Sequence, residues 1–379
     1  MDPNIIIVGG GCAGMQLIYQ LLQLPFEQTG TILLLERAAE PAKKSWCFWS
    51  KEPTLYEGLV SKKWSKISFA STHKQLTESI HPYQYNYINS DDFFQFHEQV
   101  LRDSNRVKRV KAEVKELISE DTHVRVLTDQ GEFNANLVYD SRIEFDRLPE
   151  SANVLWQHFK GFFIETKEAI FDTETAMLMD FSIDQGDAVH FMYVLPFSST
   201  QALVEFTVFS KLSAYQDAEY ERYLKAYIDQ KFNTSYKILR VESGRIPMTD
   251  FNFGSADDQR IRLIGSAAGA IKPTTGYAFN RIRKDTRDLV KCLDNPTLGP
   301  RTVFRKKRFR LYDKLLLMII RDEPHQIRRV MEQLFYNNPF RRILDFLDEE
   351  SSFRQEIAIF SQLPIRLFLK QVLKHVFAR

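Results

Sequence analysis

The chain begins with a short apolar strand that runs directly into a glycine-rich turn, and this arrangement constrains its fold more than any other feature. Residues 5–8 are Ile-Ile-Ile-Val, and residues 9–14 are Gly-Gly-Gly-Cys-Ala-Gly. The pattern predicts a strand, a helix over 15–24, a second strand over 31–35, and Glu36 at the end of that strand. This is the strand–turn–helix–strand–acid order of a dinucleotide-binding βαβ unit, with about 20 residues from turn to acid.

The glycines and the acid of this segment have separate physical roles. Gly9 allows the tight turn, Gly11 lets a pyrophosphate approach the backbone, and Gly14 lets the helix pack closely on the strand. The N-terminus of the helix offers free N–H groups and a partial positive charge to the phosphates, and Glu36 accepts hydrogen bonds from a ribose. The residues expected to bind a cofactor here are Gly9, Gly11, Cys12, Ala13, Gly14, Glu36 and Arg37.

A second glycine segment follows far along the chain. Residues 260–264 predict a strand, residues 265–269 (Gly-Ser-Ala-Ala-Gly) a turn, and Thr275-Gly276 the start of a helix. One long ligand, FAD rather than NAD, would span both glycine segments. The positive end of the second helix would then face the isoalloxazine edge and favour an anionic reduced flavin. The alternative is a β–α connection whose glycines serve packing only. The candidates for flavin binding are Gly265, Ser266, Thr275 and Gly276.

Composition and charge indicate a globular, reduced protein with a basic C-terminal part. The 379 residues suffice for two or three packed units that share one cleft, and 30 Phe and 15 Tyr suit an apolar pocket as well as a core. Cys12, Cys47 and Cys292 have no metal-ligand spacing, and no signal peptide precedes the first strand, so we expect cytoplasmic thiols and no metal site. Residues 301–379 contain 17 Lys and Arg against 9 Asp and Glu, which suggests an anionic surface as a partner.

The order of elements predicts an α/β (α+β) protein with a Rossmann-type FAD-binding domain, a β-rich substrate domain and a helical C-terminal region. Strands are expected over 156–165, 176–181, 189–196 and 202–209, a helix over 215–232, and a small antiparallel sheet over 106–140 that closes with a return strand from Leu137. The expected boundaries are 1–60, 105–145 and 255–295 for the FAD-binding domain, 61–104 and 146–254 for the substrate domain, and 296–379 for the helical region.

One predicted strand contains an acid in apolar surroundings. Alternation over 203–209 places Leu203, Glu205, Thr207 and Phe209 on one face, and both faces are mostly apolar, as in a covered central strand. Burial disfavours a carboxylate and would keep Glu205 protonated. The alternative is a structural glutamate paired with an arginine. Glu165 and Asp180 are further acids that either orient Glu205 or are ordinary strand-edge residues.

Several segments are specific in combination: Ser-Trp-Cys-Phe-Trp (45–49), Trp-Gln-His-Phe-Lys-Gly (156–161), Met-Asp (179–180), Tyr-Val-Leu-Pro-Phe-Ser (193–198), Leu-Val-Glu-Phe-Thr (203–207) and Lys-Pro-Thr-Thr-Gly-Tyr-Ala-Phe (272–279). In this order they resemble the lycopene cyclases of carotenoid biosynthesis, specifically the bacterial β-cyclase branch. The resemblance implies the glutathione-reductase-like fold and a non-covalent FAD that must be reduced, with NAD(P)H as hydride donor. It also implies isomerisation of the ψ ends of lycopene to β-ionone rings, giving γ-carotene and then β-carotene.

Under this resemblance, Glu205 is the general acid that protonates the alkene and takes a proton back. Two positions depart from the family: Ser266 stands where flavoproteins of this fold often have Asp, and Phe206 stands where many relatives carry a second acid. Two other interpretations share the flavin site. One is an FAD-dependent monooxygenase of the aromatic-hydroxylase type, and the other is a flavin-binding carotenoid carrier without enzymatic activity.

The basic C-terminal region suggests how an apolar substrate is reached. Apolar residues recur among basic ones in the sequence, which predicts a helix lying in an anionic membrane interface at the inner face of the cell membrane. The alternative is a packed helical cap with a solvated charged face. Nucleic acid is not expected as a partner, because stacking aromatic residues on a sheet are missing from this pattern. The apolar residues of the predicted membrane-interface helix are Phe304, Phe309, Leu311, Leu315 and Ile319, and its basic residues are Arg305, Lys306, Lys307, Arg308, Arg310 and Lys314.

Overall fold

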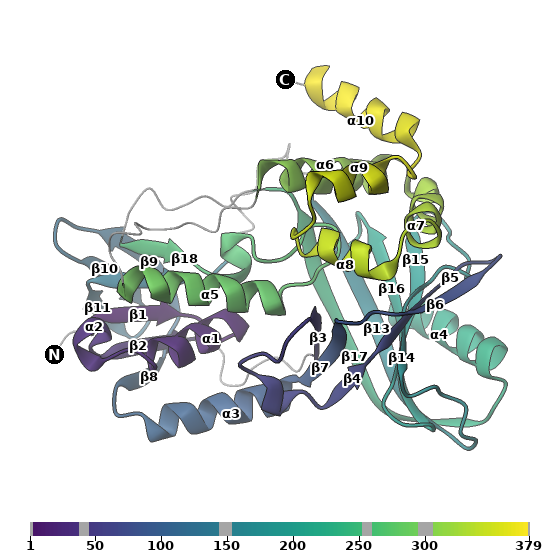
Figure 1. Cartoon of the computed structure of the whole chain (residues 1–379). Helices are drawn as coiled ribbons and strands as arrows, with labels where there is room; N and C mark the ends of the chain where they lie inside the picture. The colour runs from purple at the N-terminus through teal and green to yellow at the C-terminus, as the bar shows by residue number, and fades with distance from the viewer. Residues whose placement is uncertain (1–2, 38–44, 144–153, 252–259, 295–305, 378–379) are drawn as a thin grey trace.

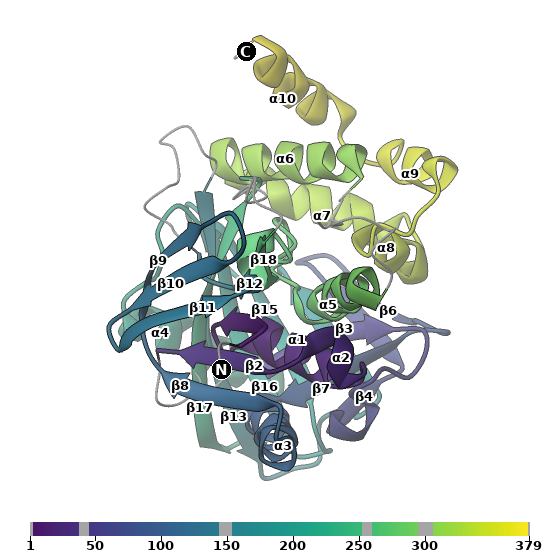
Figure 2. The same ribbon diagram turned by 90° about the vertical axis from the view of Figure 1, so that its left-hand side faces the viewer.

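A computed structural model describes residues 3–37, 45–143, 154–251, 260–294 and 306–377. It contains a parallel sheet at one end of the molecule and a larger, mainly antiparallel sheet at the other, with the C-terminal helices across the top (Figure 1). Figure 2 views the same molecule along the direction that joins the two sheets, and α10 (Ile365–Phe377) lies at the upper edge of the molecule in both views, against α6 (Lys307–Asp322).

The first sheet has five parallel strands in the order β18-β12-β1-β2-β8. All four residues of β1 are buried, as expected for a parallel strand that is covered on both faces. The predicted return strand is confirmed as β12, whereas β8 joins this sheet rather than the small antiparallel one. The strands are β1 (Ile5–Val8), β2 (Ile32–Glu36), β8 (Val107–Lys111), β12 (Leu137–Asp140) and β18 (Ile261–Leu263).

Alternate residues of β1 and β2 face two different layers. Ile5 and Ile7 pack with the helices, while Ile6 and Val8 pack with a three-stranded antiparallel sheet in the order β11-β10-β9. The helices are α1 (Cys12–Leu21), α2 (Phe26–Thr29), α3 (Ser90–Asp103) and α5 (Phe279–Asp294), and the strands are β9 (Val114–Ser119), β10 (Val124–Thr128) and β11 (Gly131–Ala135).

The large sheet has seven strands in the order β17-β13-β16-β15-β14-β5-β6, antiparallel except between β14 and β5. The four strands predicted between 156 and 209 are confirmed, but the 14-residue β17 was not predicted. A smaller sheet has the order β3-β7-β4, and β5 and β6 of the large sheet come between β4 and β7 in the chain. The bounds are β3 (Ser45–Ser50), η1 (Glu57–Leu59), β4 (Lys62–Trp64), β5 (Lys66–Ala70), β6 (Gln75–Ser79), β7 (Gln84–Asn89), β13 (Val154–Thr166), β14 (Thr175–Asp180), β15 (Val189–Pro196), β16 (Gln201–Ser210) and β17 (Tyr236–Thr249).

The two faces of the large sheet are covered by different helices. The predicted helix over 215–232 is confirmed as α4 (Asp217–Phe232), and it packs on one face with Val204, Phe206 and Val208. The C-terminal helices pack with residues of the other face, among them Leu203 and Phe209. These helices are α6 (Lys307–Asp322), η5 (Pro324–Gln326), α7 (Ile327–Tyr336), α8 (Phe340–Leu347), α9 (Phe353–Phe360) and α10 (Ile365–Phe377).

The prediction that residues 304–319 lie in a membrane interface is wrong for the apolar face of α6. Phe309, Leu315 and Ile319 are 1%, 6% and 0% exposed, so this face belongs to the core and α6 is a packed cap. Of the predicted set, Leu311 is exposed, and Phe304 and Arg305 lie outside the described residues. Within the described ranges, no helix is both long and apolar enough to cross a bilayer.

Candidate active site

The first glycine turn has one side that is filled and one side that is open. Gly9 has φ +96°, which favours glycine, and a Cβ added to Gly14 would lie 2.0 Å from the Gly9 carbonyl oxygen. A Cβ added to Gly11 would meet nothing within 4 Å. Gly9 and Gly14 are therefore required by the turn itself, whereas Gly11 leaves space for a ligand at the N-terminus of α1.

Glu36, at the end of β2, contacts the backbone of the glycine turn. Its Oε2 atom accepts a hydrogen bond from the Gly10 amide at 2.5 Å, and Glu36 lines the large cavity together with Gly10, Gly11 and the start of α1. Arg37 points elsewhere, since its side chain is 78% exposed and lies 3.7 Å from Glu113. The predicted group around the turn therefore converges on the cavity, apart from Arg37 and the two packing glycines.

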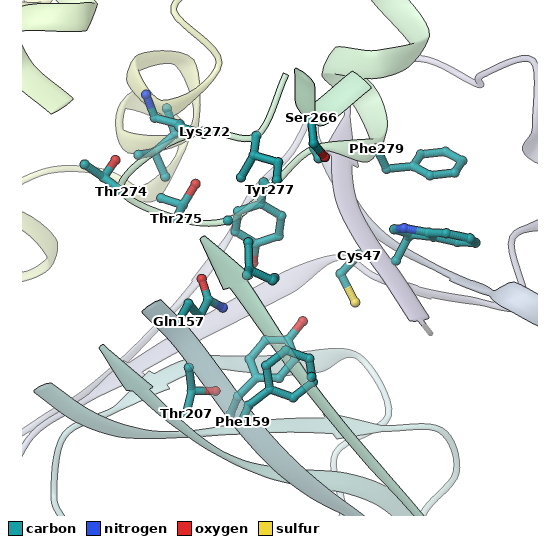
Figure 3. A pocket seen from close by; sticks show the side chains of 18 of the residues that line it. Cys47, Gln157, Phe159, Thr207, Ser266, Lys272, Thr274, Thr275, Tyr277 and Phe279 are labelled. Atoms are coloured by element: carbon teal, nitrogen blue, oxygen red, sulfur yellow. The ribbon is translucent and has the colours of Figure 1, made fainter. Parts of the chain in front are cut away.

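The cavity has a volume of about 710 Å³ and connects the glycine turn with the inner face of the large sheet. Its wall includes Gln157 and Phe159 of β13, Thr207 of β16, Cys47 of β3 and the 266–279 segment, which surround a common space in Figure 3. Its far side is formed by α6, α7, α9 and α10, through residues such as Tyr312, Met331, Phe360, Leu363 and Phe368. The wall of the cavity is mostly apolar.

The second glycine segment packs directly against the first. Gly265 has φ +60°, and a Cβ added there would lie 2.6 Å from the Cβ of Ala13. Ser266 follows it and lines the cavity. The predicted helix start is wrong by a few residues, because α5 begins at Phe279 and the preceding residues form turns, with the Gly276 amide donating to the Lys272 carbonyl at 2.9 Å. The cavity is therefore lined here by this loop as well as by the start of α5, through Phe279 and Ile282.

Buried side chains hold this loop in place. Lys272 lies 3.1 Å from Asp313 of α6, and the Thr274 hydroxyl donates to the same carboxylate at 2.8 Å. Two atoms of the cavity wall, Gln157 Oε1 and Thr275 Oγ1, are buried and have no hydrogen-bond partner within the described part of the chain. Since buried polar atoms are nearly always paired, these two atoms indicate a ligand with hydrogen-bonding groups.

Glu205 projects into the cavity as the alternation of β16 predicts. Leu203, Glu205, Thr207 and Phe209 all line the cavity. Glu205 is 8% exposed, and its Oε1 atom accepts a hydrogen bond from the Thr207 hydroxyl at 2.6 Å. The pKa of Glu205 is raised to about 8, mainly by burial and in part by the negative charge of Glu242, while the bond from Thr207 opposes this rise. This carboxyl group is mostly protonated at neutral pH.

The arginine-paired alternative for Glu205 finds no support. Among the residues that the structure describes, no lysine, arginine or histidine forms a salt bridge with it. Its neighbours on the cavity side are instead hydroxyl and thiol groups. The Tyr85 hydroxyl contacts that of Tyr193 and lies 2.7 Å from that of Tyr277, and burial raises the pKa of the nearby Cys47 thiol to about 12. Glu205 therefore faces neutral groups and one other acid.

Glu165 and Asp180 lie away from the residues that line the cavity. Glu165, at the end of β13, accepts a hydrogen bond from Gln201 at 2.8 Å and lies 3.9 Å from Lys237. Asp180 is fully buried on the α4 side of the sheet, where it accepts hydrogen bonds from Tyr227 at 2.8 Å and Lys231 at 3.3 Å. Both acids have structural partners, and the geometry does not bring them to Glu205.

Glu242 is an acid of the cavity wall that escaped the sequence analysis. It lies on β17, and both its oxygens accept from the Ser45 hydroxyl at 3.0 Å. Half of the 14 residues of β17 are exposed and one is buried, so the strand has no clear apolar alternation. The one hint in the sequence is the glycine of Glu-Ser-Gly at 242–244, which is typical of a site in a strand where a neighbouring side chain approaches closely.

Comparisons with known proteins identify the family of this chain. The family described as "Lycopene cyclase protein" matches residues 4–372. The lycopene beta-cyclase of Pseudescherichia vulneris is 28% identical over 178 residues, which cover 43% of this chain and 45% of that protein. Those of Pantoea ananas and a Paracoccus species are 29% and 26% identical, covering 50% and 64% of this chain and 51% and 67% of those proteins. The matches span about half the length of two of these relatives.

Solved structures with a similar fold include a protein crystallised with FAD. HpxO of Klebsiella pneumoniae, complexed with FAD and uric acid, has a TM-score of 0.66 at 13% identity and covers 95% of this chain and 97% of that one. A geranylgeranyl bacteriochlorophyll reductase-like protein of Thermoplasma acidophilum has a TM-score of 0.60 at 12% identity and covers 97% and 98%. The expected fold class is confirmed: a Rossmann-type flavoprotein fold with a β-rich second half and a helical C-terminal region.

Proposed function

The chain belongs to the lycopene cyclase family, and we propose that it is a lycopene β-cyclase, which converts the ψ end groups of lycopene to β-ionone rings with no net redox change. The products would be γ-carotene and then β-carotene. The observation that carries this proposal is the protonated Glu205 in the wall of an apolar cavity that also reaches a dinucleotide-binding turn.

Cyclisation requires an acid that is still protonated at neutral pH, because an alkene is a poor base. Glu205 would give its proton to the terminal alkene of a ψ end, whose electron pair forms the new C–H bond. The resulting carbocation closes the ring, and the ring carbon then returns a proton to the Glu205 carboxylate. The mostly apolar wall would exclude water, which otherwise would capture the cation.

The residues at the glycine turn fit FAD. The space beside Gly11 is open, and the N-terminus of α1 lines the cavity. Among the described residues, Gln157 Oε1 and Thr275 Oγ1 have no hydrogen-bond partner and could bond to the cofactor. When bound and reduced, the cofactor would supply negative charge that stabilises a nearby carbocation without electron transfer. NAD(P)H is the proposed hydride donor, from the family resemblance. We expect Gly11, Cys12 and Ala13 to hold the pyrophosphate, Glu36 the ribose, and Ser266, Thr275 and Gly276 the flavin end.

Lycopene is confined to bilayers, so the proposed substrate requires a membrane-facing surface. The candidate is the exposed apolar and basic surface of α9 and α10, which also contribute Phe360 and Phe368 to the cavity wall. Arg354 and Arg366 lie exposed on these helices, and the single acid between residues 353 and 375, Glu356, is buried. We propose that this surface binds an anionic membrane interface and that lycopene reaches the cavity from it. Its exposed apolar residues are Phe353 (63%), Ile357 (54%), Ile365 (59%), Leu369 (53%) and Leu373 (56%).

Expression in a lycopene-accumulating bacterium tests the function directly. Pigment extracts should contain β-carotene in place of lycopene, with γ-carotene as an intermediate. Unchanged lycopene, from cells that contain folded and FAD-loaded protein, would contradict the proposal.

The fold neighbours include an FAD-dependent monooxygenase-like protein, so oxygenation is the second candidate. Oxygen consumption with NADPH and aromatic substrates distinguishes the two. A cyclase should consume no oxygen in proportion to its product, whereas a monooxygenase consumes one molecule of oxygen for each product molecule.

A further inference from the structure

Glu205 and Glu242 lie on either side of a glycine in the large sheet. In the β13–β16 register Glu205 is opposite Gly161, and in the β13–β17 register Glu242 is opposite the same Gly161. Directly opposed residues of antiparallel strands point to the same face, so both acids project from the cavity face. Their backbones are about 10 Å apart, since neighbouring strands lie about 4.8 Å apart.

Gly161 leaves the space between the two acids unfilled. A Cβ at this position would lie 2.7 Å from Leu203 Cδ1 and 3.3 Å from Glu205 Cβ. Any other residue would therefore press on the Glu205 side chain and stand between the carboxyl groups. With glycine, the two long side chains share one low-dielectric gap, and both Glu205 and Glu242 line the cavity.

The surroundings favour the negative charge on Glu242 and the proton on Glu205. Glu242 receives the Ser45 hydroxyl at 3.0 Å and lies 4.0 Å from the Arg240 guanidinium. Within the described part of the chain, Glu205 receives the Thr207 hydroxyl. Burial raises the pKa of Glu242 above its usual range, and the hydrogen bond from Ser45 and the charge of Arg240 oppose this rise.

The other titratable groups around the pair do not change this assignment. Cys47, Tyr85, Tyr193 and Tyr277 face the acids from β3, β7, β15 and the 272–279 segment, and burial raises the pKa of each. Tyr87 of β7, near Glu242, has its pKa raised to about 12 by burial. All five groups are neutral at neutral pH, and among the described residues the salt bridge to the pair comes from Arg240.

We propose that Glu242 is a positioning residue that stays ionised across Gly161 and thereby holds the reactive proton on Glu205. Two carboxyl groups that share one site do not both ionise readily, so the pair keeps one proton at neutral pH. The fold thus supplies from β17 the second acid that is missing beside Glu205, where the chain has Phe206. The role of this proton in cyclisation rests on the proposed function. The sharing of the proton between the two acids does not, because it can be measured without substrate.

The experiment is an infrared pH titration of the FAD-loaded protein. The infrared carbonyl band that is present in the parent protein and absent in Glu205→Gln is assigned to the protonated Glu205 carboxyl group. The pH at which half of this band is lost is the titration midpoint of Glu205. In Glu242→Gln this midpoint should fall by about one pH unit or more, because the nearby negative charge is gone. Glu242→Asp should restore most of the shift, and the alkaline limit of the cyclisation rate should move with the midpoint.

Ser45→Ala provides an independent variant that keeps both acids. It removes the hydroxyl that favours charge on Glu242 and should lower the Glu205 midpoint by less than Glu242→Gln does. Glu165→Gln is the matched control, since Glu165 lies outside the cavity wall, and it should leave the midpoint unchanged. An unchanged midpoint in both Glu242→Gln and Ser45→Ala would overturn the inference. Failure to form β-carotene with the midpoint shift intact would instead overturn the proposed function.

Discussion

At the scale of single residues, Glu205 shows how a strand position determines the protonation of an acid. The alternation of β16 directs the side chain to the cavity, and the adjoining strands remove it from water. The Thr207 hydroxyl stabilises the carboxylate but does not outweigh burial. The result is a carboxylic acid that can donate a proton near neutral pH.

Glu205→Gln should abolish ring formation while FAD remains bound. The amide keeps the shape of the side chain and cannot donate the required proton, so the rate should fall by a factor of about 100 or more. Pigment extraction and flavin absorbance measure the two properties. Glu165→Gln makes the same chemical change outside the cavity and should retain β-carotene formation. Substantial cyclisation by Glu205→Gln would assign the proton to another group.

The cyclisation rate should decline in alkaline solution. The pKa of Glu205 is raised to about 8, so the donor is protonated well below that pH, half-protonated near it, and ionised above it. The rate should therefore fall about tenfold per pH unit above the midpoint. Initial rates measured with chemically reduced FAD separate this effect from hydride supply. A rate that rises through this range would indicate that the carboxylate is the active form.

Gly11→Val should prevent FAD uptake without unfolding the protein. Gly11 is extended (φ −76°, ψ −167°), a conformation that valine adopts readily, and its side chain would occupy the open space at the α1 N-terminus. Flavin fluorescence titration of the apoprotein measures the affinity. Gly58→Val is a suitable control, because a Cβ at Gly58 also meets nothing within 4 Å and Gly58 lies away from the cavity wall. Equal affinity in the two variants would contradict the assignment.

At the scale of elements, α6 and α10 have similar patterns of apolar and basic residues but different environments. The apolar side of α6 is covered by the sheet and by neighbouring helices, whereas α10 lies at the edge of the molecule (Figure 1), where Leu367 and Phe368 pack against the core and its other apolar side is exposed. Ile365, Leu369 and Leu373 recur every four residues and stay exposed. An amphipathic pattern therefore predicts a face but not what covers it.

Vesicle sedimentation tests α9 and α10 as the membrane-binding elements. Binding should increase with anionic lipid and weaken in high salt. Replacing Arg354 and Arg366 with Gln should cost about 1 kcal/mol for each charge. Replacing Lys108 and Lys111 of β8 removes the same charge from another part of the molecule and should have a smaller effect. If both pairs reduce binding equally, the attraction is not localised on these helices.

At the scale of the whole molecule, a buried ion pair joins the flavin-side loop to the C-terminal helices. Lys272 and Asp313 are both at most 4% exposed, and Lys272 also lies 3.7 Å from Glu349. Arg281 of α5 contacts Glu349 at 2.7 Å. The helices that close the far side of the cavity are thereby tied to the loop near the glycine turn.

Asp313→Asn should lower the free energy of unfolding by about 3–5 kcal/mol, because it leaves the Lys272 ammonium buried without its main partner. Urea unfolding followed by tryptophan fluorescence measures this change. Lys225→Gln removes the partner of Glu221 in an exposed helical pair and should change stability by less than about 0.5 kcal/mol. Similar changes in the free energy of unfolding for the two substitutions would show that the Lys272–Asp313 pair does not stabilise the contact between the loop and the C-terminal helices.

The sequence was sufficient for features that depend on a few neighbouring residues. The β1–turn–α1–β2 order with Glu36 at its end and the cavity-facing alternation of Glu205 were predicted and are present. Strand and helix periodicity and the φ angles of glycine act within about ten residues, so they can be recognised without knowledge of the fold.

The tertiary structure alone brought a second acid to Glu205 and decided what covers each C-terminal helix. Glu242 joins Glu205 because β17 and β16 both pair with β13, and no local pattern encodes that strand order. The burial of the apolar side of α6 and the exposure of α10 depend likewise on what packs against each helix. Apolar surface is buried against whichever elements the complete chain brings together, so partners remote in sequence are determined by packing of the whole molecule.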